Sequence, residues 1–126
     1  MEYGKVKTFN DLDAWKQAYA LCLSIYTLTK QFPKDELFGL TSQIRRAVVS
    51  ISSNIAEGFS RQSIADKSHF YAIAHGSLTE VQSQLYIAKG VMYVDEPSFT
   101  KIYSQTVIVH KLLTGLIKST KQRSEK

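Results

Sequence analysis

The chain has 126 residues, of which 44% are hydrophobic and 21% are charged, and its formal net charge is +5. This length suits one domain with its own core, and two prolines and six glycines are too few for a disordered or loop-rich chain. No run approaches the ~20 apolar residues of a membrane span, and the polar start MEYGKVKTFNDLD does not read as a secretory signal. The single cysteine, Cys22, excludes an internal disulfide. We therefore expect a cytoplasmic protein with a buried, unreactive thiol and no membrane partner.

The first predicted helix spans about residues 11–31. Apolar side chains recur there at helical spacing, namely Leu12, Trp15, Tyr19, Cys22, Leu23 and Tyr26. Asn10 or Asp11 is expected to cap its start. Pro33 is expected to end it, because the residue before a proline avoids helical angles.

The second predicted helix spans about residues 35–59. Asp35 is its expected N-cap, and Gly58 is placed at its C-terminal end. Its apolar stripe should face the core: Leu40, Ile44, Ala47, Val48, Ile51 and Ile55.

The third predicted helix, residues 64–93, should open at Ser60 or Ser63. Its expected core stripe is Phe70, Ala74, Ser77, Leu78, Val81, Leu85 and Ala88. Gly76, in the middle of this helix, suggests the close approach of a neighbouring helix.

The fourth predicted helix, residues 96–120, follows the cap residue Asp95 and has Pro97 in its first turn. Its expected core stripe is Phe99, Ile102, Tyr103, Thr106, His110, Leu113 and Ile117. No segment has strand periodicity, and the connections are short. The sequence therefore predicts an all-α fold, an up-down-up-down antiparallel four-helix bundle in a single domain over residues 1–126.

The first and fourth helices carry more apolar residues than one bundle needs. The surplus residues are Ala18, Leu21 and Ile25 on the first helix and Ile108, Leu112 and Leu116 on the fourth. A monomer of this size should not leave two such stripes in water, so we expect a homo-oligomer with contacts through these residues. The alternative is that both helices simply lie deeper in the monomer.

A polar group interrupts the second helix within the run SISSNIAEGF, residues 50–59. Asn54 lies at the edge of the core stripe, and Glu57 and the neighbouring Arg45 and Arg46 lie on the polar face. A core-edge asparagine commonly fixes the register of packed helices. We therefore interpret Asn54 and Glu57, with Glu80 of the third helix, as a structural polar network.

The stretch LTSQIRRAVVSISSNIAEGFSR, residues 40–61, resembles a known signature. It is similar to the second helix of the four-helix-bundle family named for a protein encoded in the intervening sequence of bacterial 23S ribosomal RNA genes. DLDAWKQAYALCLSIYTLTKQFPKDELFGL and FYAIAHGSLTEVQSQLYIAKG resemble its first and third helices, so the resemblance covers about residues 9–118. The chain departs from the family at Ser52, where proline is frequent, and at Val81–Gln82, where Leu-Glu is common.

The resemblance implies a bundle that assembles into a ring, a homopentamer. The family is also similar to the accessory protein of diversity-generating retroelements, a basic pentamer that binds nucleic acid and a reverse transcriptase. This similarity implies an RNA or DNA partner, or a protein partner, for the chain.

No pattern in the sequence predicts catalysis, a cofactor or a metal. His69 and His75 are six residues apart, which is poor spacing for two ligands on one helix. Glu-x-x-His, His-Glu-x-x-His, Cys-x-x-Cys and Gly-rich phosphate-loop motifs are all absent from the sequence. We therefore expect a protein that is not an enzyme.

The positive charge lies at the C-terminal end. Residues 1–96 hold ten basic and ten acidic side chains, whereas residues 97–126 hold six basic and one acidic. The candidate nucleic-acid ligands are Arg45, Arg46, Arg61, Lys67, Lys111, Lys118, Lys121 and Arg123. These cations favour a weak, sequence-tolerant RNA- or DNA-binding scaffold. The alternative is a protein-recruiting scaffold without nucleic-acid binding, in which the charge serves solubility and the helix dipole.

Overall fold

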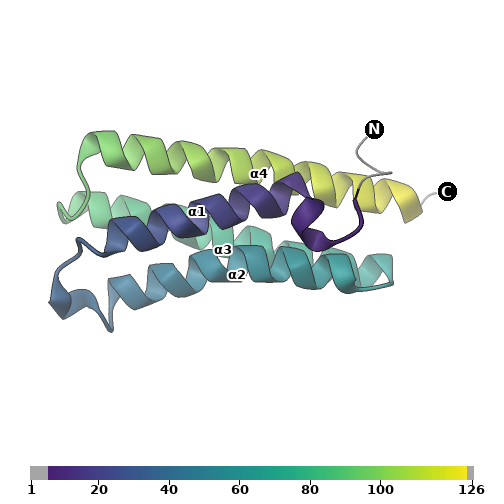
Figure 1. Cartoon of the computed structure of the whole chain (residues 1–126), viewed down its shortest axis with the longest axis horizontal. Coiled ribbons are helices and arrows are strands. Elements are labelled where there is room, and N and C mark those ends of the chain that lie inside the picture. Colours follow the sequence, from purple (N-terminus) through teal and green to yellow (C-terminus); the bar gives the residue numbers. More distant parts are fainter. Residues whose placement is uncertain (1–5, 125–126) are drawn as a thin grey trace.

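The computed structural model describes residues 6–124, which fold into four α-helices and two short 3-10 turns. The helices are α1 (Asp13–Thr29), α2 (Leu40–Ser60), α3 (Ile64–Gly90) and α4 (Glu96–Ser124), and the turns are η2 (Phe9–Asp11) and η3 (Lys34–Glu36). Successive helices run in opposite directions, and each packs against two others, with α4 closing back on α1 (Figure 1). No strand occurs within this range. The prediction of an all-α antiparallel four-helix bundle is confirmed. In residues 6–124, no helix combines the length and hydropathy needed to cross a membrane.

The first two helices begin later than the sequence predicts. Asp11 caps the turn η2 rather than α1, because its carboxylate accepts the backbone N–H groups of Lys7 and Thr8 at 2.9 and 3.1 Å. Asp35 lies within η3, and α2 starts after Gly39, whose backbone angles (φ −115°, ψ −116°) are not helical. The carboxylate of Glu36 accepts a hydrogen bond from the N–H of Leu40 at 3.2 Å. Glu36, and not Asp35 as predicted, therefore caps the start of α2.

The caps of the last two helices are confirmed at Ser63 and Asp95. Each accepts a backbone N–H three residues on, from Asp66 at 3.0 Å and from Ser98 at 2.9 Å. Helix α3 ends at Gly90, earlier than predicted, because Met92 adopts a left-handed conformation (φ 69°) that reverses the chain.

The face of α1 that packs most deeply into the bundle lies beside the one expected, although Leu12, Trp15 and Cys22 of the expected stripe are half-buried against the core. Its buried residues are Ala14, Ala18, Leu21, Ile25, Leu28 and Thr29, whereas Tyr19, Leu23 and Tyr26 are exposed. Ala18, Leu21 and Ile25 are fully buried within the monomer, so their assignment to an oligomer interface is wrong. Two apolar stripes of equal period lie side by side on this helix. The stripe with tyrosine hydroxyls stays near water, where those groups keep their hydrogen bonds.

Smaller shifts of the same kind occur in α3 and α4. Tyr71, rather than Phe70, is buried at the start of α3. In α4, Val109 is fully buried, whereas His110 is exposed. The buried positions of α4 are Phe99, Ile102, Thr106, Val109, Leu113 and Thr120, which alternate three- and four-residue steps over most of the helix.

Candidate functional site

Arg45 is half-buried and is engaged by two side chains of the neighbouring helix. Its Nε donates to the hydroxyl of Thr29 at 2.8 Å, and its guanidinium lies 4.8 Å from the centre of the Tyr26 ring. Both partners belong to α1, so Arg45 joins α2 to α1. Its neighbour Arg46 is exposed on the outer face of α2.

A short chain of hydrogen bonds crosses from α2 to α3. The hydroxyls of Ser50 and Ser77 lie 2.8 Å apart, and the Asn54 amide donates to the Ser50 hydroxyl at 3.0 Å and to its carbonyl at 2.8 Å. Asn54 therefore lies beside the contact between the two helices, and it positions the Ser50 hydroxyl that makes this contact.

Glu80 lies farther along the same contact. The amide of Gln84 donates weakly to Glu80 at 3.4 Å and to Gln43 at 3.5 Å. The Gln84 carbonyl is buried and has no hydrogen-bond partner among the described residues. A shallow depression of about 290 Å³ opens here and includes Arg46, Glu80 and both serines of the Ser50–Ser77 contact.

Gly58 permits the closest contact between α2 and α3. A Cβ built on Gly58 would lie 2.6 and 2.8 Å from two carbons of the Tyr71 ring. Its φ is not positive, and α2 continues past it to Ser60. Gly58 lies in the last turn of α2, as predicted, but it leaves room for Tyr71 rather than capping the helix.

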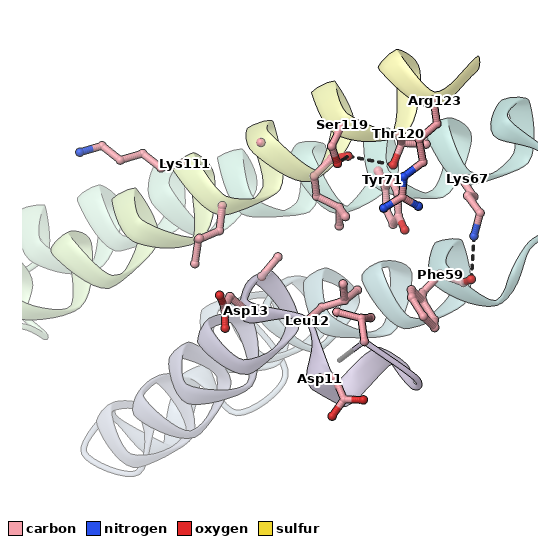
Figure 2. Close-up of a pocket in the computed structure, with 15 residues that line it drawn as sticks. Asp11, Leu12, Asp13, Phe59, Lys67, Tyr71, Lys111, Ser119, Thr120 and Arg123 are labelled. Atoms are coloured by element: carbon pink, nitrogen blue, oxygen red, sulfur yellow. Dashed lines mark hydrogen bonds between the residues drawn. The ribbon is translucent and has the colours of Figure 1, made fainter. Parts of the chain in front are cut away.

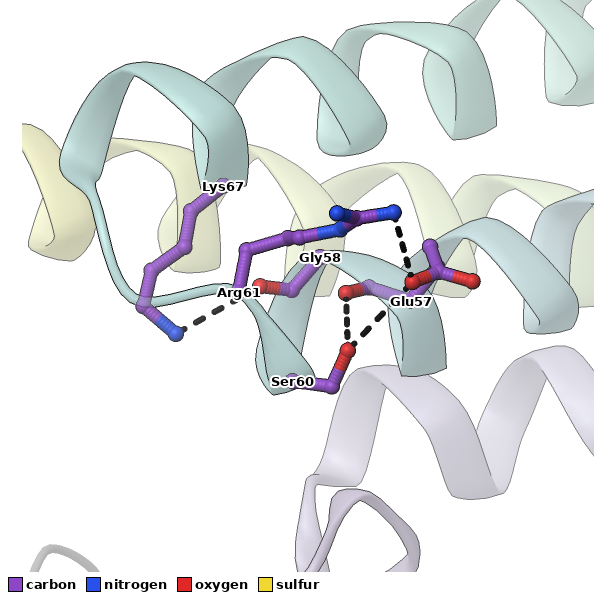
Figure 3. Close-up of polar contacts among 5 residues, drawn as sticks. All are labelled: Glu57, Gly58, Ser60, Arg61 and Lys67. Atoms are coloured by element: carbon purple, nitrogen blue, oxygen red, sulfur yellow. Dashed lines mark hydrogen bonds and ion pairs between the residues drawn. The ribbon is translucent and has the colours of Figure 1, made fainter.

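The turn between α2 and α3 is closed by charged side chains (Figure 3). Lys67 Nζ donates to the carbonyls of Phe59 at 2.8 Å and Gly58 at 3.4 Å, which caps the C-terminal end of α2. Glu57 and Arg61 form an exposed ion pair at 3.1 Å, as their four-residue spacing suggests. Arg61 also lies over the Phe70 ring, 4.6 Å from its centre.

A cavity of about 1030 Å³ lies between the start of α1 and the C-terminal half of α4 (Figure 2). Its apolar wall includes Leu12, Leu112 and Leu116. Its polar lining comes from Asp11, Asp13, Lys67, Tyr71, Lys111, Ser119, Thr120 and Arg123. Gly115 also lines the cavity, and a Cβ there would meet no atom within 4 Å. The missing side chain therefore widens the cavity.

The electrostatics of this cavity are set by burial and by two cations. Burial raises the pKa of Tyr71 to about 12, which keeps its hydroxyl protonated, although the nearby charge of Arg123 acts in the opposite direction. Burial, and then the charge of Arg123, lowers the pKa of Lys67. The charge of Arg123 thus acts on both Lys67 and Tyr71 at this end of the cavity.

The eight predicted cations do not converge on one site. Arg45 and Arg46 line a groove beside Tyr26 and Phe38, at the opposite end of the bundle from the cavity. Lys67, Lys111 and Arg123 line the cavity, and Arg61 is paired with Glu57. Lys118 and Lys121 are exposed on α4.

The residues expected at an oligomer contact on α4 also differ in exposure. Ile108 is exposed, whereas Leu112 and Leu116 are half-buried and face the cavity.

The sequence analysis did not identify Tyr71 or the cavity as functional features. A glycine in the last turn of α2, followed after a short turn by the aromatic pair Phe70–Tyr71, was the available signal.

Within residues 6–124, no three histidine, cysteine, aspartate or glutamate side chains lie close enough together to hold a metal ion. The rings of His75 and His110 lie 5.0 Å apart, between α3 and α4. Burial raises the pKa of the Cys22 thiol, which disfavours the reactive thiolate.

Comparison with protein families gives a match over residues 10–115 to the family described as 23S rRNA-intervening sequence protein. The chain belongs to this family. A crystal structure from Bacteroides thetaiotaomicron, titled as a protein of unknown function from the S23 ribosomal protein family, is similar to it with a TM-score of 0.77 and 25% identity. The alignment covers 83% of this chain and 95% of that one. Curated proteins give no match. The match covers all of α1, α2 and α3 and most of α4.

Proposed function

We propose that this chain is a non-enzymatic, self-associating bundle that binds RNA or DNA weakly and with little sequence preference. The observation that carries the proposal is a row of cations on the outer face of α4. Lys111, Lys118 and Lys121 are all exposed, and at 100° per residue they fall within an arc of roughly 80°. A helix that presents cations along one face suits the regularly spaced phosphates of a nucleic acid.

Self-association, as the homopentamer that the family resemblance implies, would repeat this row around a ring. The support is the apolar surface that the monomer leaves in water. Tyr19, Leu23 and Tyr26 are exposed on α1, and Ile108 is exposed on α4 beside the lysines. These residues replace Ala18, Leu21 and Ile25 as the proposed contact of α1. The resemblance to the retroelement accessory protein, inferred from the sequence, would imply the same combination of a basic ring and a nucleic acid.

The test combines light-scattering mass with fluorescence anisotropy of short labelled RNA and DNA at low and moderate salt. The native chain should form a multimer near five copies and bind with an affinity that falls steeply with salt. The triple variant Lys111→Gln, Lys118→Gln, Lys121→Gln should lose most binding, and its log–log salt slope should shrink by about 0.7 for each phosphate contact removed from a single strand.

The control is the triple variant Lys16→Gln, Lys30→Gln, Lys34→Gln, which removes the same charge from exposed positions on α1 and near η3. It should keep binding close to that of the native chain. If both triple variants weaken binding equally, net charge alone is responsible. The proposal that the lysines of α4 form the binding surface is then wrong. If the native chain does not bind at low salt, the nucleic-acid function is wrong.

The second candidate is a scaffold that recruits a protein. It is favoured by an apolar groove formed by Tyr26, Leu37, Phe38 and Val49 on α1, the η3–α2 connection and α2. Phe38 is 94% exposed, which is unusual for a phenylalanine in a folded chain. If the chain forms a multimer that binds neither RNA nor DNA, the protein-recruiting scaffold becomes the better-supported function.

A further inference from the structure

We propose that the cavity between α1 and α4 is a binding site for a monocarboxylate with an unbranched apolar chain. The cavity has two unlike parts. One end carries Lys67, Tyr71 and Arg123, and the wall between the helices is formed by Leu12, Leu112 and Leu116. Its volume of about 1030 Å³ lies at the upper end of the range for small-molecule sites, which are mostly apolar with a few convergent polar groups.

The polar end contains a donor that the fold itself does not use. Tyr71 is only 1% exposed, and its environment within residues 6–124 includes no hydrogen bond to its hydroxyl. Figure 2 shows this hydroxyl at the cavity, beside the guanidinium of Arg123. An acceptor placed in the cavity would give this hydroxyl a hydrogen-bond partner.

Charge makes the acceptor an anion. Lys67 and Arg123 both line this end of the cavity, and the charge of Arg123 acts on Lys67 and on Tyr71. A carboxylate has two oxygens that accept several hydrogen bonds, so one head group can accept from the phenol and from a cation at this end of the cavity.

The rest of the cavity favours an apolar body over a polyanion. Asp11 and Asp13 line its α1 side. Two backbone N–H bonds lower the pKa of Asp11, so that its carboxylate stays charged at neutral pH. A nucleic-acid strand laid along the cavity would meet these negative charges with each further phosphate. A single carboxylate at the cationic end, with its chain along the leucines, avoids this repulsion.

Gly115 supplies the space for that chain. It lies in the interior of α4, where glycine costs helix stability by up to about 1 kcal/mol relative to alanine. No atom lies within 4 Å of the position of its missing Cβ, so packing within the monomer does not require a glycine there. A larger residue at this position would project into the open space beside Leu112 and Leu116.

The experiment is calorimetric titration of the full chain with sodium decanoate below its micellar concentration, beside decanol at matched concentration. Decanoate should saturate one site per chain, and decanol should bind at least tenfold more weakly. Gly115→Leu should abolish binding because it fills the cavity. Gly76→Leu is the matched control, since Gly76 is an exposed, open position on α3 outside the cavity, and it should bind as the native chain does.

Two further variants test the head group. Tyr71→Phe keeps the ring against Gly58 and removes only the hydroxyl, and Arg123→Gln removes one charge. Each should weaken decanoate by about tenfold or more, the usual worth of a hydrogen bond to a charged group. Lys118→Gln removes the same charge from α4 outside the cavity and should have little effect. Lys118 belongs to the proposed RNA row and, unlike Lys111, does not line the cavity, so its loss should weaken RNA binding and leave decanoate binding unchanged.

The proposal is overturned if decanoate does not bind, if decanol binds equally well, or if Gly115→Leu binds like the native chain. It is also overturned if Gly115→Leu changes the mass measured by light scattering while decanoate binding persists. That result would make the cavity a contact between copies of the chain.

Discussion

The α2–α3 contact and the α1–α4 contact differ sharply at the same end of the bundle. Between α2 and α3, Gly58 lets the Tyr71 ring approach so closely that no Cβ fits. Between α1 and α4, Gly115 faces open space in a cavity of about 1030 Å³. Both residues are glycines in long helices, yet one closes an interface and the other opens one. The comparison teaches that a helical glycine has meaning only through what faces it.

Gly58→Ala should give the largest effect. Its Cβ would lie 2.6 Å from a Tyr71 ring carbon, so the ring or α3 must move, and overpacking of this kind costs about 1–3 kcal/mol. Urea unfolding followed by circular dichroism would measure the loss. Gly58→Ala in a Tyr71→Leu background should cost much less than in the native chain. An equal cost in both backgrounds would mean that the Tyr71 ring is not what Gly58 accommodates.

The pH dependence of stability reports how closely Tyr71 is enclosed. Its folded pKa of about 12 lies above the ordinary value of 10.0, so the neutral phenol is favoured in the fold. This contribution is complete below pH 10 and is lost as the pH rises from 10 to 12. The native chain should lose up to about 2 kcal/mol more than Tyr71→Phe over this window, as measured by urea unfolding at each pH. Parallel pH curves for the two proteins would contradict the enclosure of the hydroxyl.

Gly115→Ala should act in the opposite direction from Gly58→Ala. With open space around the new Cβ, the main effect is the better helix propensity of alanine, which stabilises by up to about 1 kcal/mol. The same urea measurement applies, and Gly76→Ala on α3 should give a gain of similar size. Destabilisation by Gly115→Ala would show that another chain or segment packs against this position.

The sequence predicted the four helices better than it predicted which of their faces pack together. Four helices, their antiparallel order and the caps Ser63 and Asp95 follow from periodicity and local hydrogen bonding, which nearby residues decide. Which face turns inward is a tertiary property. The exposed Tyr19 and the buried Ala18 are both compatible with the period of α1, and only the shape of the other helices selects between them.

The candidate site was less predictable still. Five of the eight predicted cations lie in local contacts or at the cavity, but nothing in their spacing places Lys67 of α3 near Arg123 of α4. The fold brings them together because α3 starts where α4 ends (Figure 1). The burial of Tyr71 was not predicted, because Phe70 beside it fits the apolar stripe of α3 equally well.

Ser77→Ala tests the polar part of the α2–α3 contact. It removes the 2.8 Å hydrogen bond to Ser50 and leaves that partly buried hydroxyl with the Asn54 amide alone. The expected loss is about 0.5–1.5 kcal/mol in urea unfolding. Ser83→Ala, an exposed serine on the same helix, is the matched control for helix propensity. If both variants change stability equally, the hydrogen bond adds nothing to the contact.

The ion pair of Glu57 and Arg61 should have the smallest effect, although it lies one residue from Gly58. Its side chains are 46% and 44% exposed, so water and salt screen the attraction. Glu57→Gln should change stability by less than about 0.5 kcal/mol, and 1 M NaCl should remove even that difference. Arg61→Gln should cost slightly more, because Arg61 also covers the Phe70 ring. A loss from Glu57→Gln as large as that from Gly58→Ala would mean that charge, rather than the fit of Tyr71 against glycine, closes this end of the α2–α3 contact.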